Sequence, residues 1–405
     1  MATSARLIPT RIEATGSPRQ PPALNDELLE EIFLRIASPA DLARASTACV
    51  SFRRLIADPA FLRRYRSLHP PPLLGFLSSS NSFRFKPVEA PCPNAPAARA
   101  LDRAADFSFD YVPLARGLRW YIGDVRSGRV LLVSLTAFGS PLPACCRPHL
   151  AVCDPLSRGY LLLPPVPGDL LASVQMQQVH LSYLEAFLAP CGEEEDDTSF
   201  RVICWVECWV PCSISVVFVF SSASGLWSVG ASTSWDALSL NVPGAGWPSL
   251  SRARSADGWL YWKVLSRNKL LKLDINRMEF STIDLPPGHE NRDVVIVEAG
   301  EGRTVMVSHI SSETFMCYAI RQNEGQNANE WKMENKILLP IYLKCRLMGA
   351  AGGYIFLLDR YRDDGVHVSL HVKTLNIETS CWKGFYLCLS YPYFGFAPSM
   401  SPRRI

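Results

Sequence analysis

The sequence predicts a multidomain α+β protein, in which a small N-terminal domain of three helices precedes an all-β propeller of six blades, with seven as the alternative. Three observations predict this division. Helical periodicity is sustained only between Leu24 and Tyr65. Beyond the prolines at 70–72, short apolar runs rich in β-branched and aromatic residues continue to the C-terminus, separated by turn residues. Aromatic residues that follow polar turns recur at intervals of about 50 residues, which is typical of propeller blades.

Length and composition support this organisation. We expect residues 1–19 to form a disordered arm, residues 20–68 the helical domain and residues 73–405 the propeller-like domain. Hydrophobic residues make up 48% of the 405-residue chain, enough to bury a core, and a net charge of +3 indicates no nucleic-acid partner. Several of the 13 cysteines lie in apolar, strand-like runs, where a free thiol acts as a small hydrophobe. A reducing compartment is therefore expected, cytoplasmic and/or nuclear.

One apolar segment, residues 202–220, is long enough to raise the question of a membrane span. It contains Glu207 and Pro211, however, and it is dense in β-branched and aromatic residues. We therefore expect two buried strands, at about 200–209 and 214–221, and no membrane partner.

The helical domain begins with an amphipathic pattern in which Leu28, Leu29, Ile32, Phe33 and Ile36 share one face. Asn25 or Asp26 can cap this first helix. The second helix is expected to start at Ser38-Pro39 and to bury Leu42, Ala45, Cys49 and Val50, and Asp58-Pro59 repeats the same start signal for the third. Three helices in about 40 residues cannot bury this much apolar surface among themselves, so a partner protein is expected to cover part of it.

These residues resemble an F-box, in order and spacing. The passages that carry the resemblance are residues 24–36 (LNDELLEEIFLRI), 41–42, 49–56 and 58–61. Two positions depart from the family pattern: Asn25 stands where proline is usual, and Phe52 where tryptophan is usual. The resemblance implies that a Skp-type adaptor protein binds this domain. The residues that it assigns to the adaptor-facing surface or its support are Leu24, Asp26, Leu28, Ile32, Leu42, Val50, Phe52 and Leu55.

The repeat in the β domain is carried by aromatics that follow polar turns: Tyr160, Trp227, Phe280, Trp331 and Trp382. Phe109, one period before Tyr160, suggests a sixth unit. A second recurring signal is a glycine that opens a strand, at 128, 258, 302 and 353. Together these patterns predict kelch-like propeller blades.

The β domain is similar to the propeller-like, F-box-associated region of plant F-box proteins, especially those of grasses. The passages that carry this similarity are residues 71–76, 106–109, 152–158, 218–222, 298–302 and 401–405. The similarity implies the substrate-recognition subunit of an SCF-type cullin–RING E3 ubiquitin ligase. Such a subunit binds the adaptor, through it the cullin and RING subunits, and an unidentified target protein that is then ubiquitinated.

Motifs for catalysis are missing from the sequence. There is no G-x-S-x-G, no phosphate-binding G-x-x-x-x-G-K-[ST] and no H-E-x-x-H. Cys204, Cys208 and Cys212 lack paired metal-ligand spacing, and His367 and His371 lack a third ligand. We expect no catalytic residue, cofactor or metal. The alternative is a propeller enzyme or sugar-binding protein that carries a non-functional helical leader.

Two further expectations concern the β domain. The apolar segment 391–396 should pair beside a strand from the start of the domain, because closing a ring of blades removes open sheet edges. The interval between Tyr160 and Trp227 is the longest in the repeat. Residues of about 168–200, with the acidic run 193–197, are therefore expected to form a loop on the rim that contributes to target selection.

Overall fold

In the computed structural model, the chain folds into two compact units, Met1–Pro70 and Pro71–Ile405. The disordered arm expected at residues 1–19, the acidic run 193–197 and Trp382 lie outside the described residues. The structure describes residues 24–69, 71–78, 82–90, 92–114, 118–135, 148–174, 181–190, 199–208, 214–240, 249–256, 258–298, 304–311, 314–321, 330–338, 345–351, 354–359, 367–371 and 390–395.

The first unit contains four described helices: α1 (Asp26–Leu34), α2 (Pro39–Ser46), α3 (Val50–Ile56) and α4 (Pro59–Leu68). The three expected caps are present. The Asn25 side chain accepts a hydrogen bond from Leu28 N (3.0 Å), that of Ser38 from Asp41 N (3.3 Å), and that of Asp58 from Ala60 N (2.7 Å). Each cap satisfies a backbone N–H that a helix start leaves without an intrahelical partner.

The expected count of three helices is wrong. α2 ends at Ser46, and Cys49 adopts an extended conformation (φ −156°, ψ 167°) as the N-cap of a separate helix, α3, which starts at the next residue. Val50 therefore does not lie on the buried side of α2, and both Cys49 and Val50 are exposed. The core of the unit consists of Phe33, Leu34, Leu42, Leu55, Ile56, Phe61 and Tyr65.

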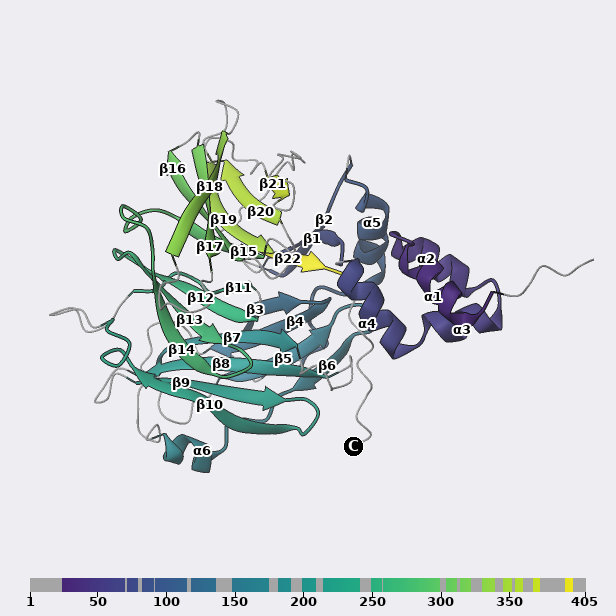
Figure 1. The fold of residues 1–405 in the computed structure, drawn as a ribbon. Helices are drawn as coiled ribbons and strands as arrows, with labels where there is room; N and C mark the ends of the chain where they lie inside the picture. The colour runs from purple at the N-terminus through teal and green to yellow at the C-terminus, as the bar shows by residue number, and fades with distance from the viewer. Residues whose placement is uncertain are drawn as a thin grey trace, which may run out of the picture. The chain divides into compact units, whose positions relative to one another are not determined.

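The second unit is an all-β propeller built from antiparallel sheets, with two described helices, α5 (Ala95–Ala104) and α6 (Gly168–Ser173) (Figure 1). Its described strands form six sheets, four of them four-stranded meanders in chain order. Such meanders are the usual form of a propeller blade. The first two meanders are β3 (Arg119–Arg126), β4 (Arg129–Leu135), β5 (His149–Asp154) and β6 (Gly159–Leu162), then β7 (Leu181–Pro190), β8 (Phe200–Cys208), β9 (Ile214–Ser221) and β10 (Leu226–Ser234).

Two more meanders and a three-stranded sheet follow along the chain. They are β11 (Arg254–Ala256), β12 (Trp259–Val264), β13 (Lys269–Asp274) and β14 (Glu279–Asp284); then β15 (Val294–Glu298), β16 (Thr304–Ser311), β17 (Thr314–Arg321) and β18 (Glu330–Leu338); then β19 (Cys345–Ala351), β20 (Tyr354–Asp359) and β21 (His367–His371). The strands predicted after glycines are β4, β12, β16 and β20, each of which is the second strand of its sheet. At Gly128 and Gly258 the backbone is left-handed (φ +77° at both), a conformation that favours glycine.

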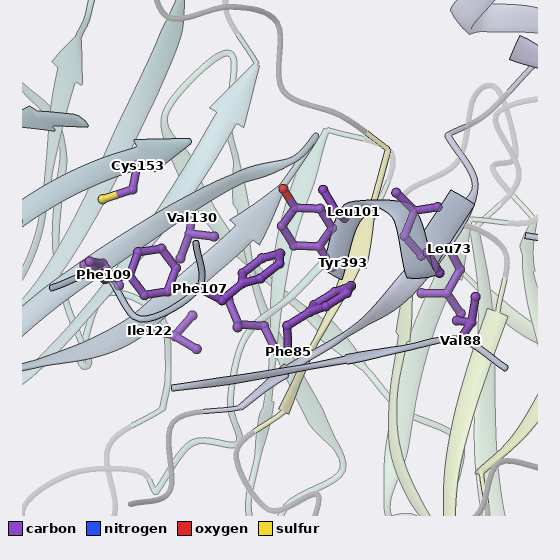
Figure 2. Close-up of a cluster of buried hydrophobic side chains, with 14 of the residues drawn as sticks. Leu73, Phe85, Val88, Leu101, Phe107, Phe109, Ile122, Val130, Cys153 and Tyr393 are labelled. Atoms are coloured by element: carbon purple, nitrogen blue, oxygen red, sulfur yellow. The ribbon is translucent and has the colours of Figure 1, made fainter. Parts of the chain in front are cut away.

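The remaining sheet joins the two ends of the unit. β1 (Leu73–Ser78) pairs on one side with β2 (Arg84–Pro87) and on the other with β22 (Ser390–Phe394), for example Leu77 with Tyr391. The pairing expected for the C-terminal segment is thus confirmed. Figure 2 shows the core beside this sheet, where Tyr393 packs edge-on against the stacked rings of Phe85 and Phe107.

The repeat aromatics occupy the same strand position in each four-stranded meander. Tyr160, Trp227, Phe280 and Trp331 lie on β6, β10, β14 and β18, the fourth strand of four successive sheets. Phe109 does not belong to this series, because it lies in a turn before β3 with φ +56° and is 1% exposed. It fills the core beside α5 instead.

Two further expectations for residues 168–221 have different outcomes. The strands predicted at 200–209 and 214–221 are confirmed as β8 and β9, and no described helix is long and apolar enough to span a membrane. The rim loop predicted at about 168–200 is wrong. Its described part contains α6 and β7, and β7 pairs with β8 along its length and buries Ala186, Phe187 and Leu188. Residues 181–190 therefore belong to a sheet.

Candidate partner-binding site

The first unit exposes large apolar side chains that its own core does not cover. Leu24, Leu28 and Ile32 are 52%, 53% and 46% exposed, and Val50 is 81% exposed. Leu28 and Ile32 lie one helical turn apart on α1, so they share a side of that helix. We call Leu24, Leu28 and Ile32 the apolar face; Val50 is a further exposed apolar residue, at the start of α3.

The apolar face exists because α1 is apolar on two sides. Phe33 and Leu34 point into the core, where they are 4% and 5% exposed, while Leu28 and Ile32 remain outside it. A helix that only covered its own core would have polar residues at those outer positions. Large exposed apolar residues next to one another mark a surface that binds a partner.

The other residues assigned to adaptor binding lie behind or beside the apolar face. Leu42 and Leu55 are buried in the core of the unit, at 4% and 8% exposure. Phe52 is half-buried, and its ring lies 5.0 Å from that of Phe33 in an edge-to-face contact. These three residues therefore support the packing of α1 and do not belong to its exposed side.

The C-terminal end of α1 is held by the last turn of α4. The hydroxyl of Tyr65 donates to the carbonyl of Ile36 (2.8 Å), and Nε2 of His69 lies 2.7 Å from the carbonyl of Leu34. Burial raises the pKa of the Tyr65 hydroxyl, so it stays protonated and can donate. Both contacts satisfy carbonyls that a helix end leaves open, and they fix the orientation of α1.

Ion pairs join α1 to the other helices at its polar edge. Arg64 on α4 reaches Glu30 and Glu31, each at 3.0 Å, and Arg54 on α3 reaches Asp26 at 3.2 Å. Asp26, an assigned site residue, is thus exposed and paired within the unit. The roles of Arg54 and Arg64 could not be predicted from the sequence, because their partners lie about 30 residues away and no local spacing indicates the pairing.

Within the described part of the chain, the residues considered for chemistry are not arranged as a reactive or metal-binding site. Burial raises the pKa of the Cys204 thiol to about 12, and that of Cys153 is also raised, so neither thiol is reactive near neutral pH. His367 and His371 occupy the two ends of β21, opposite Leu358 and Tyr354. Among the residues that the structure describes, no three His, Cys, Asp or Glu side chains are grouped so that they could hold a metal ion.

Comparison with solved structures finds propellers of low similarity. The periplasmic gluconolactonase PpgL of Pseudomonas aeruginosa is 13% identical (76% of this chain and 82% of that chain covered, TM-score 0.41). A putative 6-phosphogluconolactonase of Bacteroides fragilis is 12% identical (82% and 84% covered, TM-score 0.36). The lectin SapL1, solved with alpha methyl fucoside, is 10% identical (66% and 80% covered, TM-score 0.36). At these TM-scores the similarity carries no functional argument.

No curated protein sequence matches the chain. A family model does match, over residues 121–346, which is more than half of the chain and runs from β3 to β19. The model is described as "F-box protein AT5G49610-like, beta-propeller". This chain therefore belongs to the family of F-box proteins that carry an AT5G49610-like β-propeller.

Proposed function

We propose that this protein is the substrate-recognition subunit of an SCF-type cullin–RING E3 ubiquitin ligase. In this proposal the helices α1–α4 form an F-box that binds a Skp-type adaptor, and the propeller captures a target protein. The observation that carries it is the apolar face, with Leu28 and Ile32 about half exposed on a helix whose opposite side is already buried. Membership of an F-box protein family supports the same assignment.

The proposed mechanism is proximity. The adaptor connects this chain to the cullin and RING subunits, and the propeller holds the target so that its lysines face a ubiquitin-charged enzyme. Confining two reactants to one complex raises their effective concentration, so this chain needs no catalytic residue, cofactor or metal of its own. We place this action in the cytoplasm and/or nucleus.

Two finer features belong to the proposal. We assign six kelch-like blades to the propeller, one for each of the six described sheets, with the sheet of β2, β1 and β22 closing the ring. We also assign the chain to the grass-type F-box proteins of plants, on the residue passages given above that extend from 71–76 to 401–405.

The test is adaptor binding by the full chain. The variant Leu28→Lys/Ile32→Lys should lose binding to a Skp-type adaptor, because two ammonium groups would have to be desolvated in an apolar contact. Its thermal stability should stay close to that of the parent, since both side chains are exposed. The matched control is Ala43→Lys/Ala48→Lys, which adds the same charge at two exposed alanines outside α1 and should retain binding.

Undiminished adaptor binding by Leu28→Lys/Ile32→Lys would contradict the F-box assignment. Equal loss in the variant and in the control would indicate an electrostatic effect of added charge, and would also contradict a specific role for the apolar face.

A further inference from the structure

A cavity of about 660 Å³ lies where first strands of successive sheets approach one another in the propeller. Its described lining comes from β11 and the residues before it, from β12 and the turn after it, from β15 and the loop before it, from β19 and β20, and from the sheet that joins the two ends of the unit. β11, β15 and β19 also contact each other directly. The volume is in the range of pockets that hold small ligands.

The described lining of this cavity carries an excess of positive charge. Four cationic side chains line it, namely Arg252, Arg254, Lys263 and Arg292, against the two carboxylates of Glu290 and Asp293. These six residues come from three segments, 252–254, 263 and 290–293, which folding brings to one place. A concave site with one dominant sign of charge concentrates ligands of the opposite sign.

Part of this charge is held in place by the protein itself. The buried Lys263 donates from Nζ to the backbone carbonyl of Glu290 (2.6 Å), and the carboxylate of Glu290 accepts from Nδ2 of Asn268 (2.6 Å). Lys263 and Glu290 are therefore tied into the loop before β15. This arrangement fixes the position of the loop beside the cavity.

The arginines are oriented by their neighbours. The guanidinium of Arg252 lies over the ring of Tyr391, 3.9 Å from its centroid. That of Arg254 lies beside Gly349, where an added Cβ would be 3.3 Å from Cζ. Burial, and next the charge of Arg252, lower the pKa of Arg254 to about 10, while the carboxylate of Glu185 acts in the opposite direction. The guanidinium groups of Arg252 and Arg254 thus both contribute positive charge at the wall of the cavity, and a bound anion would offset that charge.

We propose that this cavity is a binding site for an anionic group, a phosphate or a carboxylate, with Arg252 and Arg254 as its principal ligands and Arg292 at its edge. Guanidinium groups suit both anions, because their donors match two oxygens at once. The group belongs either to a free small molecule or to a side chain of the captured protein. The proposal does not rest on adaptor binding, which involves other residues.

The test is calorimetric titration of the full chain with inorganic phosphate and with citrate, at an ionic strength kept constant with sodium chloride. We expect saturable binding of at least one anion, weakened about tenfold or more by Arg252→Met and by Arg254→Met. The matched control is Arg119→Met, which removes an exposed arginine on β3 that does not line the cavity and should leave the affinity unchanged. If Arg254→Met fails to fold, Arg252→Met alone decides.

A second arm distinguishes the two sources of the group. A pair of peptides that differ only in phosphorylation of one serine is titrated in the same way. A preference for the phosphopeptide that Arg252→Met abolishes assigns the group to a captured protein, whereas binding of phosphate or citrate without that preference assigns it to a free small molecule. Heats no larger than those with chloride, or affinities that Arg252→Met leaves unchanged, would overturn the proposal.

Discussion

The indole Nε1 of Trp331 donates a hydrogen bond to the backbone carbonyl of Asp284 over 3.0 Å, and this bond joins the fourth strand of one sheet to the end of the fourth strand of the preceding sheet. The same contact occurs elsewhere in the propeller. Nε1 of Trp227 on β10 donates to the carbonyl of Pro164, just beyond β6, over 2.7 Å. The repeat aromatics seen in the sequence thus include two indoles that connect neighbouring sheets, because an indole N–H reaches a carbonyl that a strand end leaves open.

The first prediction concerns these two bonds. Trp227→Phe and Trp331→Phe should each destabilise the protein by about 1 kcal/mol, because a backbone carbonyl loses its donor while most of the apolar area is kept. The loss of stability should be larger for Trp227→Phe, because the side chain of Trp227 is buried (7% exposed). Chemical denaturation monitored by circular dichroism gives the difference.

Trp259→Phe is the matched control. It removes an indole that packs under the Lys272 ammonium and for which no hydrogen bond from Nε1 is described. Similar destabilisation by all three substitutions would mean that ring size, and not the hydrogen bond, accounts for the effect.

The second prediction concerns the C-terminal strand. Tyr393 is 1% exposed, and its hydroxyl donates to the carbonyl of Gly128 over 2.6 Å, which joins β22 to the turn between β3 and β4. Tyr393→Phe should cost about 1–3 kcal/mol, because the carbonyl becomes unsatisfied in a buried place. Tyr121→Phe, at an exposed position on β3, should be close to neutral in the same denaturation experiment. Equal stability of the two variants would contradict a role for this bond.

The third prediction is that β22 is required for the whole β unit. Deletion of residues 391–405 removes most of β22, leaves the backbone groups of β1 without their partner and opens the core around Phe85. The truncated protein should unfold or aggregate, as judged by circular dichroism and size-exclusion chromatography. A second truncation that ends at Gly395 keeps all of β22 and should melt near the parent. Cooperative melting of the longer deletion at the parent's temperature would show that ring closure is dispensable.

Local signals in the sequence were sufficient for some elements and not for others. The caps at Asn25, Ser38 and Asp58 depend only on neighbouring residues, so they could be predicted. The break at Cys49 could not, because no proline or glycine separates Thr47 from Val50 and the helical pattern continues across it. The glycine signal and the aromatic repeat predicted particular strands, since the glycines precede the second strand of four sheets and the aromatics lie on the fourth strand of four sheets.

Features that depend on distant parts of the chain were harder to predict. The apolar face could be predicted because the first helix carries more apolar residues, Leu28 and Ile32 among them, than so small a helical unit can bury. The strand β7 was missed because its position was inferred from an interval and not from its own apolar pattern. The cavity arginines were missed for another reason: Arg252, Arg254 and Arg292 come together only when different sheets pack side by side.

The fourth prediction concerns Gly75 on β1. A Cβ at this position would lie 2.3 Å from the carbonyl oxygen of Lys86 and 2.6 Å from the ring of Phe85, both on the paired strand β2. Gly75→Ala should therefore destabilise the protein by about 2–4 kcal/mol, because the carbonyl oxygen of Lys86 cannot move away without breaking the pairing of β1 with β2.

Gly168→Ala is the control: nothing lies within 4 Å of its added Cβ, and it starts α6, so it should be neutral or slightly stabilising. A neutral Gly75→Ala in thermal unfolding would show that β1 and β2 separate more easily than this geometry indicates.

The fifth prediction is a pH dependence that originates at Glu207 on β8. Burial, and next the charge of Glu185, raise the pKa of Glu207 to about 7 from its ordinary 4.5. Because the folded state holds this proton more tightly than the unfolded state, the contribution of Glu207 is fully favourable below pH 4.5. It is lost progressively as the pH rises from 4.5 towards 7, and the loss is complete above that.

Glu207→Gln cannot ionise, so it should be more stable than the parent at pH 8 by about 1–3 kcal/mol and should remove this part of the pH profile. Glu279→Gln, which removes an exposed carboxylate on β14, should keep the parent's profile in the same denaturant titrations from pH 4 to pH 8. A parent-like slope in Glu207→Gln would assign the pH dependence to other groups.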